Sequence, residues 1–259
     1  MRGIERFHEF FRGFENQYVL IGGAACELIF TEQGALFRAT KDLDIVLVVE
    51  SITHEFGVRL WDFIHMGGYE IKCRSNGAPI LYRFSKPKNS DFPYMIELFS
   101  RGFLDWPTAY NVLPISFDDT ISSLSAILLD ESYYKLIVNG SQSLHGISLL
   151  RPEFILLLKA RAFLDYLGRY MEGAYEHESD IRKSMRKHRD DALRLATILV
   201  PDLRVDLPSI IKSDLKKFLD ITRVSKEDVS PSFQKRVISL DEIIVLLQNI
   251  YGIGVESKE

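Results

Sequence analysis

The chain has 259 residues, of which 46% are hydrophobic and 26% charged, with 32 basic against 36 acidic side chains. This is ordinary globular composition, which excludes disordered, collagen-like and low-complexity proteins. A formal net charge of −4 does not mark a dedicated nucleic-acid binder, although a local basic patch remains open. No run approaches the roughly eighteen apolar residues of a membrane span, so we expect no membrane partner. The two cysteines, Cys26 and Cys73, are far apart and form no metal-spaced set, so we expect a reduced, cytoplasmic protein.

The first half of the chain reads as strands and helices in alternation. Apolar, β-branched runs predict strands, and apolar residues three to four positions apart predict helices. We expect, in chain order, a helix over 4–14, a strand over 18–21, a helix over 24–30, a strand over 42–49, a helix over 54–66, and strands over 69–74, 80–85 and 94–100. The sequence therefore predicts an α/β (α+β) fold, a mixed sheet with flanking helices.

The second half is helical in its spacing after Pro152. We expect helices over 153–171, 178–199, 208–220 and 239–251. Three prolines, which stop helices, fall between these segments: Pro201, Pro208 and Pro231. The pattern predicts two domains, an α/β domain over 1–148 and a C-terminal helical bundle over 149–259.

Two motifs in the first half lie at the ends of predicted elements. Gly22 and Gly23 stand where a strand turns into a helix, where glycine lets the backbone approach a ligand and free N–H groups attract phosphate. Asp42 and Asp44 open the next strand, and alternation puts both carboxylates on one side of it. Such close carboxylates repel each other unless a cation lies between them, and hard, oxygen-seeking Mg²⁺ suits them. A simple turn and a polar strand edge are the alternatives.

Glu97 is a third acidic residue of interest. It lies in a predicted strand with apolar residues on both sides, where an uncompensated carboxylate is costly to bury. An arginine partner, Arg83 or Arg101, would remove this cost, and so would a metal ion. With Asp42 and Asp44 on an adjacent strand, Glu97 would complete a cluster of three carboxylates able to hold two divalent ions.

These features, in this order, resemble the nucleotidyltransferase (polymerase-β-like) superfamily. The segment IGGAACELIF…FRATKDLDIVLV is most similar to AbiEii-type, MenT-like nucleotidyltransferases, many of which are toxins of bacterial toxin–antitoxin pairs. The Arg-x-Thr/Ser-x-Asp-hydrophobic-Asp run of that family is here Arg38, Thr40, Asp42 and Asp44. Gly23 departs from the wider superfamily, where many members carry a phosphate-binding serine.

The resemblance implies a role for each matching residue. Asp42, Asp44 and Glu97 would bind Mg²⁺ or Mn²⁺ and carry catalysis. In the second half, GISLLRPEFILLLKARAF resembles the family's strand, turn and helix with an inward lysine, and KHRDD resembles its Lys-x-x-Asp segment. The residues with an implied nucleotide-binding role are Gly22, Gly23, Arg38, Thr40, Lys159, Lys187 and Asp190.

The residues alone leave alternatives open in the second half. Lys159 lies within an apolar turn of helix, so its ammonium either meets triphosphate or extends to solvent. Lys187 and Asp190 are three positions apart, which also suits an ordinary helical ion pair. His188 falls in an apolar stripe and is expected to be packed. A basic run either contacts RNA phosphates or forms a solvated face answered by nearby aspartates, and its members are Arg182, Lys183, Arg186, Lys187 and Arg189.

The resemblance implies an enzyme that moves a nucleoside monophosphate from a nucleoside triphosphate (NTP) to a hydroxyl and releases pyrophosphate. The toxin-like relatives imply tRNA or another RNA as acceptor and an antitoxin protein as partner, with a protein or small molecule as other acceptors. The alternative is a catalytically silent module of the same fold that binds nucleotide or a partner protein.

Overall fold

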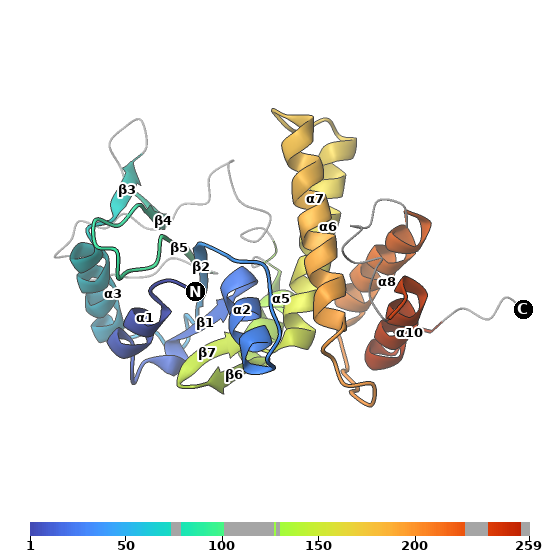
Figure 1. Cartoon of the computed structure of the whole chain (residues 1–259), viewed down its shortest axis with the longest axis horizontal. Coiled ribbons are helices and arrows are strands. Elements are labelled where there is room, and N and C mark those ends of the chain that lie inside the picture. Colours follow the sequence, from blue (N-terminus) through green and yellow to red (C-terminus); the bar gives the residue numbers. More distant parts are fainter. Residues whose placement is uncertain (74–78, 101–126, 128–129, 226–237, 255–259) are drawn as a thin grey trace, which may run out of the picture. The chain divides into compact units, whose positions relative to one another are not determined.

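The computed structural model describes residues 1–73, 79–100, 127, 130–225 and 238–254, with backbone alone over 71–73 and 79–82. The described residues fall into two compact units (Figure 1). The first comprises residues 1–121 and 134–151, and the second comprises 122–133 and 152–259. The predicted division at residue 148 lies close to the point after Arg151 where the chain passes from the first unit to the second.

The first unit is built on a seven-stranded sheet in the order β3-β4-β5-β2-β1-β7-β6. Two neighbouring pairs, β2 with β5 and β1 with β7, are parallel, and the others are antiparallel. The strands are β1 (Tyr18–Ile21), β2 (Asp42–Leu47), β3 (Glu70–Cys73), β4 (Pro79–Ser85), β5 (Met95–Phe99), β6 (Ser141–Leu144) and β7 (Ile147–Leu150). This mixed sheet with flanking helices is the α/β (α+β) fold that the sequence predicts.

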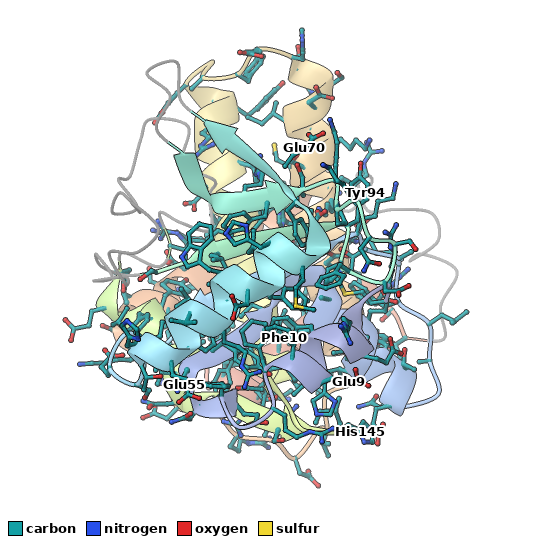
Figure 2. The ribbon with its side chains drawn as sticks, turned by 90° about the vertical axis from the view of Figure 1, so that its left-hand side faces the viewer. Glu9, Phe10, Glu55, Glu70, Tyr94 and His145 are labelled. Atoms are coloured by element: carbon teal, nitrogen blue, oxygen red, sulfur yellow. The ribbon has the colours of Figure 1, made fainter. Side chains whose placement is uncertain are left out.

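One face of this sheet is apolar and carries helices α1 (Ile4–Phe10) and α3 (His54–Gly67). The register aligns Leu43, Ile96 and Phe84 across β2, β5 and β4, and the Trp61 ring of α3 meets Phe84 edge-on at 5.9 Å. Phe10 of α1 packs against α3 as part of an aromatic layer (Figure 2). Because side chains alternate along a strand, the residues between these apolar ones face the other way.

Helix α2 (Gly22–Glu32) begins directly after β1 and packs against β1 and β2. It ends at Glu32, and Gly34 follows the C-cap residue Gln33 with a φ of +66°, which suits a residue without a side chain. The glycine pair therefore forms the first turn of this helix, two residues earlier than the predicted start at residue 24. This placement brings the glycine backbone against the start of β2.

The second unit is helical, as predicted. Its helices are α6 (Pro152–Met171), α7 (Glu178–Ala196), α8 (Ser209–Val224) and α10 (Leu240–Tyr251). Helices α6 and α7 form a hairpin whose members lie side by side (Figure 1). Helix α5 (Glu131–Asn139) crosses the division, with its first residues in this unit and the rest in the first unit.

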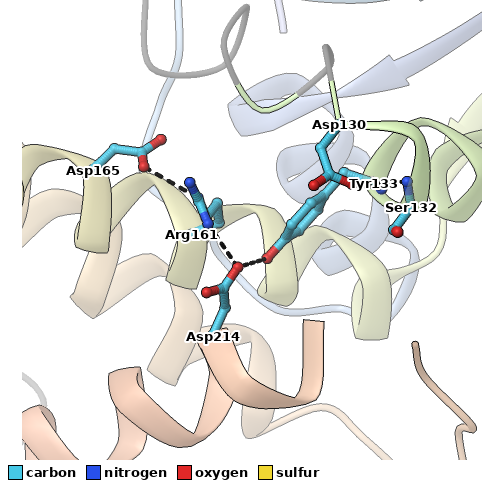
Figure 3. Close-up of polar contacts among 6 residues, drawn as sticks. All are labelled: Asp130, Ser132, Tyr133, Arg161, Asp165 and Asp214. Carbon is cyan, nitrogen blue, oxygen red and sulfur yellow. Dashed lines mark hydrogen bonds and ion pairs between the residues drawn. The ribbon is translucent and has the colours of Figure 1, made fainter. Parts of the chain in front are cut away.

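A buried polar cluster joins three elements of the second unit (Figure 3). The Tyr133 hydroxyl donates to the Asp214 carboxylate at 3.0 Å, and Arg161 Nη1 donates to the same oxygen at 2.8 Å. Arg161 Nε donates to Asp165 at 3.1 Å. Burial, followed by the charge of Asp214, raises the pKa of the Tyr133 hydroxyl. The two carboxylates account for the Arg161 charge, so we interpret the cluster as structural.

Candidate active site

Three charged side chains form a row across the polar face of the sheet in the first unit. Asp44 of β2 is the register partner of Glu97 in the parallel strand β5, and Glu97 is the partner of Arg83 in β4. Partners in register point to the same face, so Glu97 lies on the Asp44 side of the sheet. Asp42 lies two residues before Asp44 and shares this face. The strands thus bring the three predicted carboxylates to neighbouring positions.

Arg83 is the arginine partner that the sequence left open for Glu97. Arg83 Nε donates to Glu97 Oε1 at 2.6 Å, and Nη2 contacts the same oxygen. The Glu97 side chain is 14% exposed and that of Arg83 is 37% exposed, so the pair lies at the edge of the solvent. Arg101, the other candidate partner, lies outside the described residues. The ion pair satisfies Glu97 from the β4 side, away from Asp44.

Gly22 lies against the carboxylate of Asp44. A Cβ atom at residue 22 would stand 1.9 Å from Asp44 Oδ2, and its φ of +67° is in the left-handed region. Both facts require glycine here. The carboxylate therefore lies beside the first turn of α2, whose N–H groups favour negative charge. The sequence analysis predicted that the glycine backbone would approach a ligand closely, and in the structure it approaches the carboxylate of Asp44.

Gly23 adjoins Thr40 in the segment that leads into β2. A Cβ atom at residue 23 would lie 2.9 Å from Thr40 Oγ1. That hydroxyl accepts a hydrogen bond from the Asp42 backbone N–H at 3.4 Å, and the Thr40 N–H donates to Glu27 Oε2 of α2 at 3.4 Å. Thr40 fills the space that a larger residue at position 23 would need. Sequence reasoning missed Glu27, since nothing in its spacing marks it as a neighbour of this segment.

Arg38 is half-buried next to Phe37, with its guanidinium carbon 5.6 Å from that ring's centroid. This is a cation–π contact, of a kind worth about 0.5–1 kcal/mol at exposed sites. It places Arg38 two residues before Thr40 on the same connecting segment. A phosphate-binding role for Arg38 stays a prediction.

Lys159 of α6 is buried within the second unit. Its ammonium lies 3.3 Å from Asp191 Oδ2 of α7, and both side chains are under a tenth exposed. Of the two alternatives, the one in which Lys159 extends to solvent is wrong, because the Asp191 carboxylate gives the charge a partner inside the protein. The sequence analysis offered a solvated face with nearby aspartates as one alternative, and it did not predict that one of them, Asp191, pairs with Lys159. A role for Lys159 in nucleotide binding stays a prediction.

The KHRDD segment lies within α7, and its residues have different environments. Lys187 is exposed and Asp190 is half-buried. Arg189 is buried, and its Nη1 donates to Ser225 Oγ at 3.4 Å, so it is not a member of the exposed basic run. The His188 ring is packed as predicted, stacked on Tyr166 at 5.4 Å. The nucleotide-binding roles of Lys187 and Asp190 stay predictions.

The donor chemistry of the three predicted carboxylates suits a hard divalent cation. Asp42, Asp44 and Glu97 offer only oxygen atoms, which Mg²⁺ prefers, and Gly22 leaves room for Asp44 beside its backbone. Among the residues that the structure describes, no three acidic, histidine or cysteine side chains are gathered closely enough to hold a metal ion. Glu97 is instead held by Arg83. The residue types suit a cation, but the side chains as the structure describes them do not form a metal site.

Comparisons with known proteins add one distant likeness. Neither a family model nor a curated protein matches the sequence. Among solved structures, the chain is similar to an antigenic nucleotidyltransferase-like protein from Paracoccidioides brasiliensis, with 17% identity and a TM-score of 0.42 over 87% of this chain and 89% of that one. Over the described residues, every helix is too short or too polar to cross a membrane.

Proposed function

We propose that the chain is a nucleotidyltransferase of the polymerase-β-like superfamily, which moves a nucleoside monophosphate from an NTP to a hydroxyl acceptor. One observation carries the proposal. The register sets Asp44 beside Glu97, two residues after Asp42, next to a helix start that approaches Asp44 through a glycine. A polar strand edge alone does not explain why three acidic residues share one face while the other face is apolar.

In this proposal Asp42, Asp44 and Glu97 hold Mg²⁺ or Mn²⁺. When bound, the cation would lower the pKa of a coordinated hydroxyl and neutralise charge on the transferring phosphate. The Asp44 carboxylate lies against Gly22 in the first turn of α2, and we infer that this close approach positions it before substrate arrives. Glu97 lies next along the row and serves as the carboxylate that draws the proton from the acceptor hydroxyl.

Phosphate binding falls to the first turn of α2 and to the segment that leads into β2. Thr40 places a hydroxyl beside Gly23, where many members of the superfamily carry a serine at position 23 itself. We infer that the Thr40 hydroxyl takes the place of that serine as a hydrogen-bond donor to phosphate.

The acceptor and the biological setting follow from the resemblance of the sequence motifs. RNA, and a tRNA end in particular, is the acceptor we favour, with a toxin role and a cognate antitoxin protein as the corresponding setting. The test is incubation of the protein with each α-labelled NTP, Mg²⁺ or Mn²⁺ and total RNA, followed by a denaturing gel. A labelled RNA band with one NTP, lost in Asp44→Asn, supports the proposal. Label that stays in free nucleotide under all conditions contradicts transfer to RNA.

The engagement of Glu97 by Arg83 favours a second candidate, a catalytically silent module that binds nucleotide or a partner protein. In that case the ion pair would persist, and Glu97 would never reach a cation. Nucleotide binding without release of pyrophosphate, in the presence of a range of hydroxyl acceptors, would indicate this second function.

A further inference from the structure

We propose that the exposed face of helix α7, together with two tyrosines where α6 turns into α7, binds single-stranded RNA. The choice of RNA over DNA rests on the proposed function, which names RNA as the acceptor. All members of this surface, called the α7 surface below, belong to the second unit. They are Tyr170, Tyr175, Arg182, Lys183, Arg186 and Lys187.

The first support is the spacing of the basic side chains on α7. They form two adjacent pairs that are four positions, or about one helical turn, apart. All four are exposed, and the segment 181–189 contains no acidic residue. One stretch of helix therefore presents two adjacent rows of cations to the solvent, an arrangement that suits the phosphates of a nucleic-acid strand. The pairs are Arg182 with Lys183 and Arg186 with Lys187.

The second support is the scarcity of countercharges for this row. Within the part of the chain that the structure describes, neither Lys183 nor Arg186 takes part in an ion pair. Of the aspartates that would balance a solvated face, Asp191 is buried in an ion pair with α6 and Asp190 is half-buried. Asp180 stays exposed in the first turn of α7. An external polyanion accounts for the row better than these aspartates do.

The third support is a pair of aromatic rings beside the row. Tyr170, in the last turn of α6, and Tyr175, in the connection to α7, are stacked with ring centroids 5.7 Å apart and planes 15° apart. The guanidinium carbon of Arg182 lies 4.7 Å from the Tyr170 centroid, which joins the rings to the basic row. Tyr175 is 38% exposed. Proteins that bind single strands combine basic side chains with rings on which bases stack, so this pairing favours a strand with unpaired bases.

Acidic residues near the turn limit where the strand runs. Glu178 accepts a hydrogen bond from Arg182 Nε at 2.7 Å, so this carboxylate has a countercharge. Three others are exposed ahead of the basic row, namely Glu172, Glu176 and Asp180. We therefore expect the phosphates to lie along 183–187, with a base reaching Tyr175.

The test measures the affinity of the full chain for a fluorescein-labelled single-stranded RNA by anisotropy, in EDTA and without NTP, over a range of salt concentrations. Lys183→Gln/Arg186→Gln should bind about tenfold more weakly at low salt, and the slope of log K against log salt should become shallower by about 1.4, because two phosphate contacts of about 0.7 each are lost. Tyr175→Ala should bind about fivefold more weakly with an unchanged slope, because the ring stacks and carries no charge. Tyr175→Phe keeps the ring and should bind like wild type. Lys217→Gln/Arg223→Gln is the matched control, since it removes two exposed cations from α8 and should change neither affinity nor slope.

The outcomes separate this surface from the proposed function. Equal losses of affinity in the two double variants, no RNA binding by wild type at low salt, or tighter binding to duplex RNA or anionic phospholipid vesicles would overturn the α7 surface. Nucleotide transfer to RNA, with RNA affinity unchanged in Lys183→Gln/Arg186→Gln, would overturn the surface and leave the proposed function standing. RNA binding with the expected losses but without any transfer would support the surface and contradict the proposed function.

Discussion

Substitution of Gly22 by alanine tests the contact between α2 and Asp44. The new Cβ would stand 1.9 Å from Asp44 Oδ2, whereas ordinary contact begins at 3.4 Å. The carboxylate must therefore retreat by about 1.5 Å, the difference between these two distances. A shift of about 1 Å at a catalytic group is enough to cost about a hundredfold in rate.

Backbone strain adds to this steric effect. Gly22 has φ +67°, and an L-residue in the left-handed region costs about 1–2 kcal/mol. Gly34 is the matched control, because it has nearly the same φ, +66°, and a Cβ atom added there would meet nothing within 4 Å. Gly34→Ala should show the strain alone. Gly22→Ala should show the strain, a further loss from the displaced carboxylate, and loss of transfer activity.

The assay is urea denaturation of both variants beside wild type, followed by the transfer reaction. We expect Gly34→Ala to lose about 1–2 kcal/mol of unfolding free energy and keep its activity. Gly22→Ala should lose more and fall at least about a hundredfold in rate. Equal stability losses in the two variants, with activity retained in Gly22→Ala, would refute the claim that Gly22 positions Asp44.

Three further predictions concern single side chains. Asp44→Asn should abolish transfer and change the unfolding free energy in metal-free buffer by less than about 1 kcal/mol, because the attraction of the Asp44 carboxylate to the start of α2 and its repulsion from the neighbouring acidic residues oppose each other. A much lower melting temperature of the variant would show that Asp44 has a structural role. Lys159→Met should lower the unfolding free energy in urea denaturation by about 3–5 kcal/mol, because it leaves the buried Asp191 carboxylate without its ammonium partner. The double variant Lys159→Met/Asp191→Leu should recover most of this loss, and a failure to recover it would contradict the loss of the ion pair as the cause. Burial raises the pKa of Asp165 above its ordinary 3.8, so the folded protein binds more protons than the unfolded chain near that pH and loses stability as the pH rises through the two pKa values. The unfolding free energy of Asp165→Asn should therefore increase relative to that of wild type from pH 4 to 7. Parallel curves of stability against pH for the two proteins would contradict this.

The sequence predicts most regular elements of both halves because their apolar spacing is clear, but it did not predict helix α5 (Glu131–Asn139). The strand over Asp42–Leu47 and the helix over His54–Gly67 lie within two residues of their predicted limits. The sequence analysis did not predict strands β6 and β7 or the hairpin that they form. Their turn contains His145 and Gly146, both with positive φ, and His-Gly lacks the Asn-Gly signal that marks such turns in a sequence.

The candidate site was predictable in its residue types and not in its partners. Alternation along one strand placed Asp42 and Asp44 together, and the choice of Glu97 needed only its apolar flanks. Its pairing with Arg83 depends on which strands are neighbours, which periodicity does not give. The same limit hid Asp191, since the facing of α6 and α7 decides which of two adjacent aspartates meets Lys159.

The measurement that tests the central claim most directly follows the two ends of the same nucleotide. Parallel reactions contain wild-type protein, Mg²⁺ and acceptor, with the NTP labelled at the α-phosphate in one and at the γ-phosphate in the other. Nucleotidyl transfer predicts that the α label enters the acceptor while the γ label leaves as pyrophosphate, and that Asp42→Asn and Asp44→Asn abolish both. Entry of the γ label into the acceptor, or transfer that survives both substitutions, would contradict the account.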